Sequence, residues 1–209
     1  MRDPRRIVRA GYDRMASAYL AARPRDGADV QLLSELIRRV PSAGRVLDAG
    51  CGAGVPATDA LRRAGLDVVG LDFARAQLEL ARRLVPPLRV VHADLTALPF
   101  AAATFDGVVS FYAVIHVPRA EHATVFTQVC HVLRPGGLAL LCLGARDLAA
   151  DLDPDSWLGT PMFWSHFDAG TNLALLRDAG LDVILDRLVP DPMGHGEHLF
   201  ALVERRRAA

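Results

Sequence analysis

Three glycines that follow an acid at alternate positions give the clearest chemical signal in the sequence. Residues 45–54 read RVLDAGCGAG, so a short apolar run ends in Asp48 and leads into Gly50, Gly52 and Gly54. Glycine lacks a Cβ and tolerates positive φ, so a ligand can approach the main chain closely. Pro56 suits the first turn of a helix. We expect a strand, a tight turn and a helix, with free backbone N–H groups facing a ligand above the strand.

Two more acids follow apolar runs. Asp72 closes the run 68–72, 18 residues after Gly54 (72 − 54 = 18), and Asp94 follows the run 88–92. In open α/β sheets, ligands bind at the carboxyl ends of the strands, where a carboxylate can accept hydrogen bonds from ribose hydroxyls. A dinucleotide fingerprint, G-x-G-x-x-G, would need a glycine where Val55 stands. The spacing D-x-G-x-G-x-G therefore argues against a pyrophosphate-containing cofactor.

Helical spacing and short apolar runs predict the elements that position these residues. Helical spacing is found near residues 5–21, 29–40 (capped by Asp29), 56–63, 74–84, 119–133 and 169–179. Strand-like runs are found near residues 45–48, 68–72, 88–92, 106–110, 138–143, 181–188 and 197–203. Residues 144–168 have no clear period. The alternation of strands and helices predicts an α/β protein with a doubly wound parallel sheet.

Composition limits the class of protein. The 209 residues are 51% hydrophobic, which fits one domain, and the 24 basic residues, all arginine, balance 24 acids. This balance gives no reason to expect nucleic acid as a partner, and the absence of lysine excludes a P-loop. Three cysteines without a CxxC pair disfavour zinc knuckles and disulfides. We see no membrane span or signal peptide, and we expect a cytoplasmic protein.

Five segments, in order, resemble the motifs of class I S-adenosylmethionine-dependent methyltransferases: residues 47–54, 69–73, 92–106, 110–116 and 132–137. The resemblance implies a Rossmann-like seven-stranded sheet in the order 3-2-1-4-5-7-6, in which residues 197–203 supply the antiparallel strand 7. It also implies N-terminal lid helices. We expect a single domain over 1–209, made of lid helices (1–42), a cofactor-binding core (43–144), an insertion that covers the acceptor (145–168) and a C-terminal helix and strands (169–204).

The resemblance implies S-adenosyl-L-methionine as the cofactor. It assigns the glycine turn to the methionine part, Asp72 to the ribose, Phe73 to one side of the adenine and Asp94 to the adenine amino group. The expected cofactor contacts are Tyr12, Tyr19, Arg23, Asp48, Gly50, Cys51, Gly52, Gly54, Asp72, Phe73, Asp94, Leu95, Ser110 and Phe111. Simpler interpretations remain open, because acids form turns at strand ends. Tyr12 and Tyr19, two helical turns apart, form either a core stripe or a lid.

His116 lies just beyond the fourth strand, beside the expected methyl position. A histidine there can remove a proton from an oxygen or nitrogen nucleophile, or it can simply bond a loop carbonyl. Together with His116, the expected acceptor contacts are Tyr112, Trp164, His166, His195 and His198. We expect no metal, because His195 and His198 would face opposite sides of a strand.

The leading hypothesis is an enzyme that transfers a methyl group by in-line displacement to O, N or S of a small molecule, as a monomer or homodimer. One alternative is a nucleic-acid or protein methyltransferase. Against it stand the neutral charge and the sequence SFYA at residues 110–113, where an N/D-P-P-Y motif would stand. Another alternative is a protein of this fold that binds the cofactor without transferring its methyl, such as a cyclase-like catalyst or a regulator.

Overall fold

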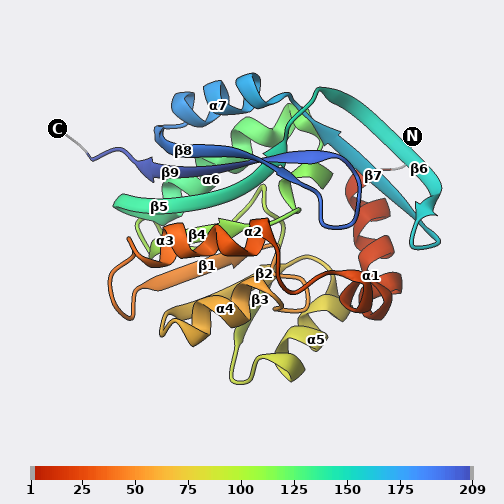
Figure 1. The fold of residues 1–209 in the computed structure, drawn as a ribbon, viewed down its shortest axis with the longest axis horizontal. Coiled ribbons are helices and arrows are strands. Elements are labelled where there is room, and N and C mark those ends of the chain that lie inside the picture. The colour runs from red at the N-terminus through yellow and green to blue at the C-terminus, as the bar shows by residue number, and fades with distance from the viewer. Residues whose placement is uncertain (1–2, 208–209) are drawn as a thin grey trace.

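The computed structural model describes residues 3–207, and the side chains of residues 153–156 are outside this description. A seven-stranded sheet forms its centre (Figure 1), in the order β3-β2-β1-β4-β5-β9-β8. The strands of this sheet are β1 (Arg45–Ala49), β2 (Asp67–Asp72), β3 (Arg89–His92), β4 (Phe105–Ser110), β5 (Leu133–Gly144), β8 (Leu181–Pro190) and β9 (Glu197–Arg205).

The first five of these strands are parallel, and β9 runs antiparallel between β5 and β8. The predicted strand order is therefore confirmed, with β8 as the sixth strand and β9 as the seventh. Parallel strands need crossover connections, which the intervening helices supply.

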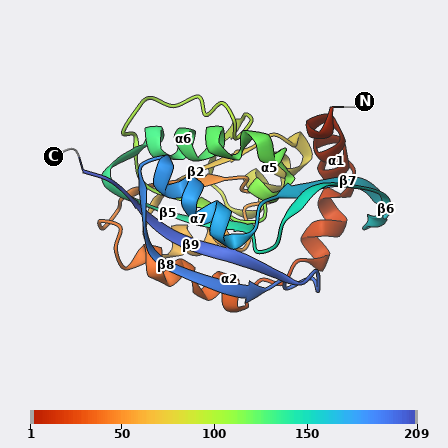
Figure 2. The ribbon, with the colours of Figure 1, turned by 90° about the horizontal axis from the view of Figure 1, so that it is seen from above.

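The helices are α1 (Pro4–Ala22), α2 (Ala28–Gln31), α3 (Leu33–Ile37), α4 (Ala57–Arg63), α5 (Arg75–Leu84), α6 (His122–Val132) and α7 (Ala169–Asp178), with two 3₁₀ turns, η1 (Val114–His116) and η2 (Arg119–Glu121). Figure 2 shows α6 on one side of the strands β5, β9 and β8, and α2 on the other. No described helix is both long enough and apolar enough to cross a membrane.

Both faces of the sheet are buried, as a doubly covered parallel sheet requires. In β1, Leu47 faces the core formed with α6 and α7, whereas Val46 faces the core formed with α3 and α4. Both side chains are fully buried. This burial on both faces explains why the central strands read as short continuous apolar runs rather than as alternating patterns.

Residues 148–166, where the sequence shows no period, form a separate antiparallel hairpin of β6 (Leu148–Trp157) and β7 (Thr160–His166). The hairpin packs against α1 at one end of the molecule (Figure 1). Its pairing shifts register twice, which explains why no simple alternation appears in the sequence.

The predicted second helix differs from the observed structure. It is divided into α2 and α3, and Gly27 rather than Asp29 occupies the N-cap of α2. Asp29 is instead buried and forms an ion pair with Arg23. The expectation that Asp29 caps the helix is therefore wrong, because the carboxylate has a stronger, charged partner.

Candidate functional site

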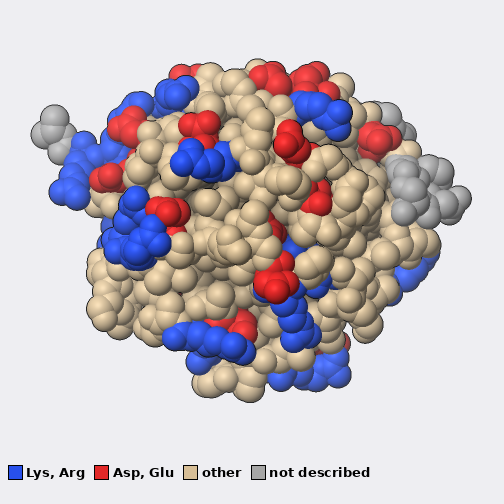
Figure 3. Space-filling view, in the orientation of Figure 1, with Lys and Arg blue, Asp and Glu red and all other residues tan. Residues whose placement is uncertain are grey.

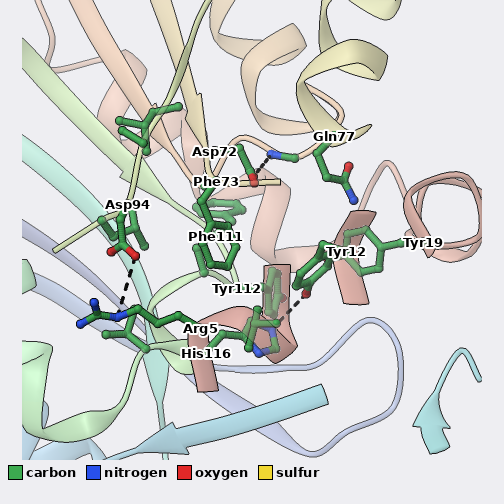
Figure 4. A pocket seen from close by; sticks show the side chains of 18 residues that line it. Arg5, Tyr12, Tyr19, Asp72, Phe73, Gln77, Asp94, Phe111, Tyr112 and His116 are labelled. Atoms are coloured by element: carbon green, nitrogen blue, oxygen red, sulfur yellow. Dashed lines mark hydrogen bonds and ion pairs between the residues drawn. The ribbon is translucent and has the colours of Figure 1, made fainter. Parts of the chain in front are cut away.

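The loops that follow the first four strands, together with α1, enclose a cavity at the carboxyl edge of the sheet (Figure 4). We call it the first cavity. Its wall includes residues from the glycine turn, from the ends of β2 and β3, and from α1: Gly50, Gly52, Asp72, Phe73, Asp94, Leu95, Phe111, Tyr112, His116, Tyr12 and Tyr19. Segments that are distant in the sequence therefore meet where an α/β sheet binds its ligands.

The glycine turn is held by its own backbone. Gly50 has φ of 86°, and a Cβ placed on it would lie 2.3 Å from the Cβ of Ala113, so only glycine fits there. The amides of Gly50 and Cys51 both donate to the carbonyl of Leu71, at 2.7 and 2.9 Å. The amide of Gly52 donates to Asp72.

These contacts correct our expectation of free N–H groups. The amides of Gly50, Cys51, Gly52 and Gly54 are all occupied within the protein. These four amides are therefore closed to an anion, and this agrees with the absence of a pyrophosphate fingerprint.

Asp72 ends β2 with both carboxylate oxygens held by the backbone. Oδ2 accepts from the Gly52 amide at 2.9 Å, and Oδ1 accepts from the Ala74 amide at 2.8 Å. Burial raises the pKa of Asp72 to about 6, although these hydrogen bonds oppose the shift. Each oxygen retains a lone pair for a ligand, so the carboxylate is fixed in place and still able to accept a pair of hydroxyls.

Asp48, at the end of β1, is 1% exposed and accepts a hydrogen bond of 2.5 Å from the Thr58 hydroxyl of α4. Burial raises its pKa to about 7. Asp48 lines a narrow side pocket together with Arg23, Cys51 and Tyr19. Arg23 donates to Asp29 and to the Pro24 carbonyl, so most of its bonding is internal.

Asp94 follows β3 and caps the next turn, because its Oδ1 accepts from the amide and the hydroxyl of Thr96, each at 2.8 Å. Its Oδ2 lies 3.9 Å from Nε of Arg5 on α1 (Figure 4), and Arg5 also pairs with Glu121. Arg5 thus ties α1 to two segments on the far side of the first cavity. Asp94 combines the two roles left open by its sequence, a turn cap and a cavity residue.

Gln77 on α5 is a cavity residue that the sequence did not reveal. It is 1% exposed, it lines the first cavity, and its carboxamide points toward Tyr12 (Figure 4). Among the described residues, neither its amide nitrogen nor its oxygen has a hydrogen-bond partner. Buried carboxamides are normally bonded, so an orphaned one facing a cavity suggests a ligand. The helical pattern of residues 74–84 gave no signal of this.

A second cavity, of about 470 Å³, adjoins the first. Its wall includes the β6–β7 hairpin, the loop between β8 and β9, and four residues that it shares with the first cavity: Tyr12, Tyr19, Tyr112 and His116. All six residues that we expected to contact an acceptor line it: Tyr112, His116, Trp164, His166, His195 and His198.

His116 lies where the two cavities meet, and its environment fixes its tautomer. Nδ1 lies 2.7 Å from the carbonyl oxygen of Phe163, which can only accept, so Nδ1 carries the proton. Nε2 is then an acceptor, and the Tyr12 hydroxyl donates a hydrogen bond to it at 3.0 Å. Burial lowers the pKa of His116 to about 4, so the ring is neutral at physiological pH.

Asp191, in the loop after β8, was also missed from the sequence. Its Oδ2 accepts from Nε2 of His198 at 2.9 Å, and the exposed fractions of the two side chains are 8% and 9%. The Met193 amide donates to Oδ1. Burial alone would raise the pKa of Asp191. The hydrogen bonds from His198 and Met193 have a larger effect in the opposite direction, so the pKa lies below its ordinary value. Asp191 is seven residues from His198, and only the turn of the loop brings them together.

Four expected cofactor contacts lie outside both cavities: Asp48 and Cys51, which line only the side pocket, and Ser110 and Gly54. The Ser110 hydroxyl donates to the Ala49 carbonyl and joins β4 to β1. Gly54 faces α5, where a Cβ would lie 3.0 Å from Val85. Both residues shape the sheet edge rather than the cavity wall. Among the described residues, no three His, Cys, Asp or Glu side chains are grouped as metal ligands.

Known proteins resemble this chain in sequence. A methyltransferase domain family model matches residues 46–137. A curated relative, methyltransferase GfsG of Streptomyces halstedii, is 33% identical over 171 residues, covering 75% of this chain and 60% of that protein. In seven further relatives the match covers between 26% and 53% of their length. The chain thus spans less than two thirds of these relatives.

Solved structures share the fold. The 1,6-didemethyltoxoflavin-N1-methyltransferase of Burkholderia thailandensis, determined with 1,6-didemethyltoxoflavin and S-adenosylhomocysteine, superposes with a TM-score of 0.73 at 21% identity, covering 99% of this chain and 92% of that one. The [4+2]-cyclase SpnF superposes with a TM-score of 0.72 at 17% identity, covering 96% and 95%. The fold is that of a Rossmann-like methyltransferase domain. Residues 46–137 match the methyltransferase domain family, and the chain resembles the class I S-adenosylmethionine-dependent methyltransferases.

Proposed function

We propose that the protein binds S-adenosyl-L-methionine in the first cavity and transfers its methyl group to a small molecule in the second. The observation that carries this proposal is the junction of the two cavities at Tyr12, Tyr19, Tyr112 and His116. In-line transfer needs donor and acceptor in separate sites that meet at one point, and this geometry supplies that arrangement.

The residues of the first cavity suit this cofactor. Asp72 has two fixed oxygens for the ribose hydroxyls, and the orphaned carboxamide of Gln77 needs a polar ligand. Asp94 has Oδ2 left for the adenine amino group. The filled amides of the glycine turn disfavour a phosphate ligand. When bound, the cofactor supplies an electrophilic methyl on a sulfonium, and the nearby tyrosine rings favour that positive charge.

His116 has a positioning role at the junction. Because Nδ1 of His116 donates to the Phe163 carbonyl, Nε2 of the same ring can only accept a hydrogen bond. A methyl acceptor that binds to Nε2 must therefore carry a proton to donate. Such an acceptor would replace the Tyr12 hydroxyl as the donor to Nε2. His116 thereby orients the nucleophile, and the surrounding side chains exclude water from the reacting atoms.

The test uses isotope-labelled cofactor and a panel of small acceptors, with mass spectrometry of the products. A product that carries the labelled methyl group supports the proposal, and His116→Ala should then lower turnover by about 10²-fold, because the acceptor loses the group that orients it. Calorimetry with S-adenosylhomocysteine tests binding separately. Failure of that ligand to bind the folded protein would overturn the proposal.

The two alternatives predict different outcomes. A nucleic-acid methyltransferase would methylate oligonucleotides, yet arginines and acids are interspersed on the face seen in Figure 3, without a broad basic surface. A protein that binds the cofactor without transferring methyl would bind S-adenosylhomocysteine and turn over none of the acceptors. The fold shared with a [4+2]-cyclase makes that outcome worth measuring.

A further inference from the structure

Five aromatic side chains that line the second cavity form a closed circuit: Tyr12, Tyr19, Trp157, Trp164 and His116. The ring centroids of Tyr12 and Tyr19 are 5.4 Å apart, and those of Tyr19 and Trp157 are 6.3 Å apart. Trp157 lies 5.6 Å from Trp164, Trp164 lies 5.7 Å from His116, and His116 lies 5.4 Å from Tyr12. Every ring therefore has two ring neighbours within the circuit.

Three of the five neighbouring pairs are nearly perpendicular, at 84°, 83° and 81°. Together with the other two pairs, these edge-to-face contacts join the five rings into one aromatic part of the cavity wall, which we call the aromatic box. The face of an aromatic ring is negative, so a box of such walls attracts a positive charge.

A buried carboxylate adds to this attraction. Asp191 lines the same cavity and is ionised at neutral pH, because its bonds to His198 and Met193 favour the charged form. His198 donates to this carboxylate through Nε2, and Asp191 brings a negative charge to the cavity wall.

The other charged side chains of the cavity wall are balanced by charges of opposite sign. Arg23 is neutralised by Asp29, and Asp147 by Arg119, at the cavity wall. The two remaining charged residues, Arg146 and Asp151, are exposed and contribute one charge of each sign. Asp191 is therefore the uncompensated charge of the described wall.

His116 indicates which kind of nucleophile this cavity favours. Burial leaves its ring a weak base, with a pKa of about 4. An alcohol must lose its proton as it attacks, and a base this weak assists that poorly. A neutral amine attacks with its lone pair and needs no prior proton loss, and its N–H can still donate to Nε2 of His116.

We propose that the second cavity takes a basic nitrogen compound, whose neutral amine nitrogen accepts the methyl group and becomes positively charged inside the aromatic box. This inference rests on the proposed function. In the step, the carbon–sulfur bond breaks with its electron pair left on sulfur, and the nitrogen lone pair forms the new carbon–nitrogen bond. The positive charge moves from sulfur to nitrogen, and an amine that still bears a proton releases it to solvent afterwards.

The chain contains two tryptophans, and both line this cavity, so tryptophan fluorescence reports its occupancy. The probes are choline and its uncharged isostere 3,3-dimethylbutan-1-ol, which has the same shape without the charge. Each is titrated with and without S-adenosylhomocysteine. We expect choline to bind about tenfold or more tightly than the isostere, as an aromatic box with a carboxylate requires.

Two variants test the assignment of the charge. Asp191→Asn keeps the shape of the side chain and should remove most of the preference for choline. The matched control, Asp182→Asn, neutralises an exposed acid outside the cavity and should leave the preference within about twofold. Trp164→Leu provides a second test if Asp191→Asn does not fold, and it should also reduce the preference.

Equal binding of the two probes, or binding of neither while S-adenosylhomocysteine still binds, would overturn the inference. If S-adenosylhomocysteine does not bind but the choline preference is present, the proposed function fails and the cation site stands. In turnover assays, amines should be methylated in preference to the alcohols of the same shape. The reverse preference would count against the amine assignment.

Discussion

The Tyr12 hydroxyl oxygen lies 3.0 Å from Nε2 of His116, although the two residues are 104 positions apart in the chain. Tyr12 belongs to α1 and His116 to η1, so this bond fastens the N-terminal helix to the point where the two cavities meet. The Tyr12 hydroxyl also occupies the lone pair of His116 Nε2 that, in the proposed function, receives a hydrogen bond from the methyl acceptor.

Tyr12→Phe removes this bond and should lower the free energy of unfolding by about 1 kcal/mol. Urea denaturation measures the change, and a double-mutant cycle with His116→Ala isolates the pair. Strictly additive effects of the two substitutions would show that the bond contributes nothing in solution.

Asp72→Ala should weaken binding of S-adenosylhomocysteine by on the order of 2–4 kcal/mol, because two charge-assisted hydrogen bonds to the ribose are lost. Calorimetry measures this. Asp72→Asn retains one acceptor oxygen for the Gly52 or Ala74 amide, so it separates loss of ligand contact from damage to the glycine turn. An unchanged affinity in the alanine variant would refute the assignment of Asp72.

Gln77→Leu should have effects of opposite sign on stability and binding. It removes a buried carboxamide that has no partner among the described residues, so the ligand-free protein should become more stable. The affinity for S-adenosylhomocysteine should fall by about tenfold, since one hydrogen bond is lost. Thermal unfolding without ligand and calorimetry with it give the two values. A loss of stability with unchanged affinity would make Gln77 a core residue only.

The pH dependence of stability should reveal Asp48. Burial raises its pKa from 3.8 to about 7, so the folded protein retains a proton that the unfolded chain releases. The resulting stabilisation is complete below about pH 4 and is lost as the pH rises through about 7, an effect of up to about 4 kcal/mol. The raised pKa of Asp72, about 6, acts with the same sign.

Asp48→Asn should therefore flatten the fall in unfolding free energy between pH 4 and 8, measured by urea denaturation across that range. The amide oxygen can still accept from Thr58, which keeps the local structure. Asp182→Asn, at an exposed position, is the matched control and should leave the curve unchanged. The same slope in the Asp48 variant and in the unsubstituted protein would contradict the prediction.

Features that depend on local pattern could be predicted from the sequence. Strands such as β2 are short apolar runs that end in an acid, and Gly50 occupies a position where only glycine fits, so these strands and the site edge followed from the residues. The strand order came from the resemblance to a known family. The hairpin of β6 and β7 could not be predicted, because its register shifts erase the alternation that identifies a strand.

Contacts set by tertiary structure were not visible in the sequence. The Gly52 amide looks free in the motif, yet the folded chain brings the Asp72 carboxylate to it. Gln77 looks like any polar residue of an amphipathic helix until α1 covers it. Asp191 and His198 become partners only when the loop between β8 and β9 turns back. Each of these depends on a backbone path that residue types do not encode locally.

Helix α1 contributes walls to both cavities through Tyr12 and Tyr19, and it is tied across the first cavity by Arg5. Under the proposed function, this one helix takes part in two binding equilibria. A ligand that fixes α1 in place changes the affinity for the other ligand, and thermodynamic reciprocity makes the factor the same in both directions. In the proposed function, the coupling between cofactor binding and acceptor binding therefore depends on α1.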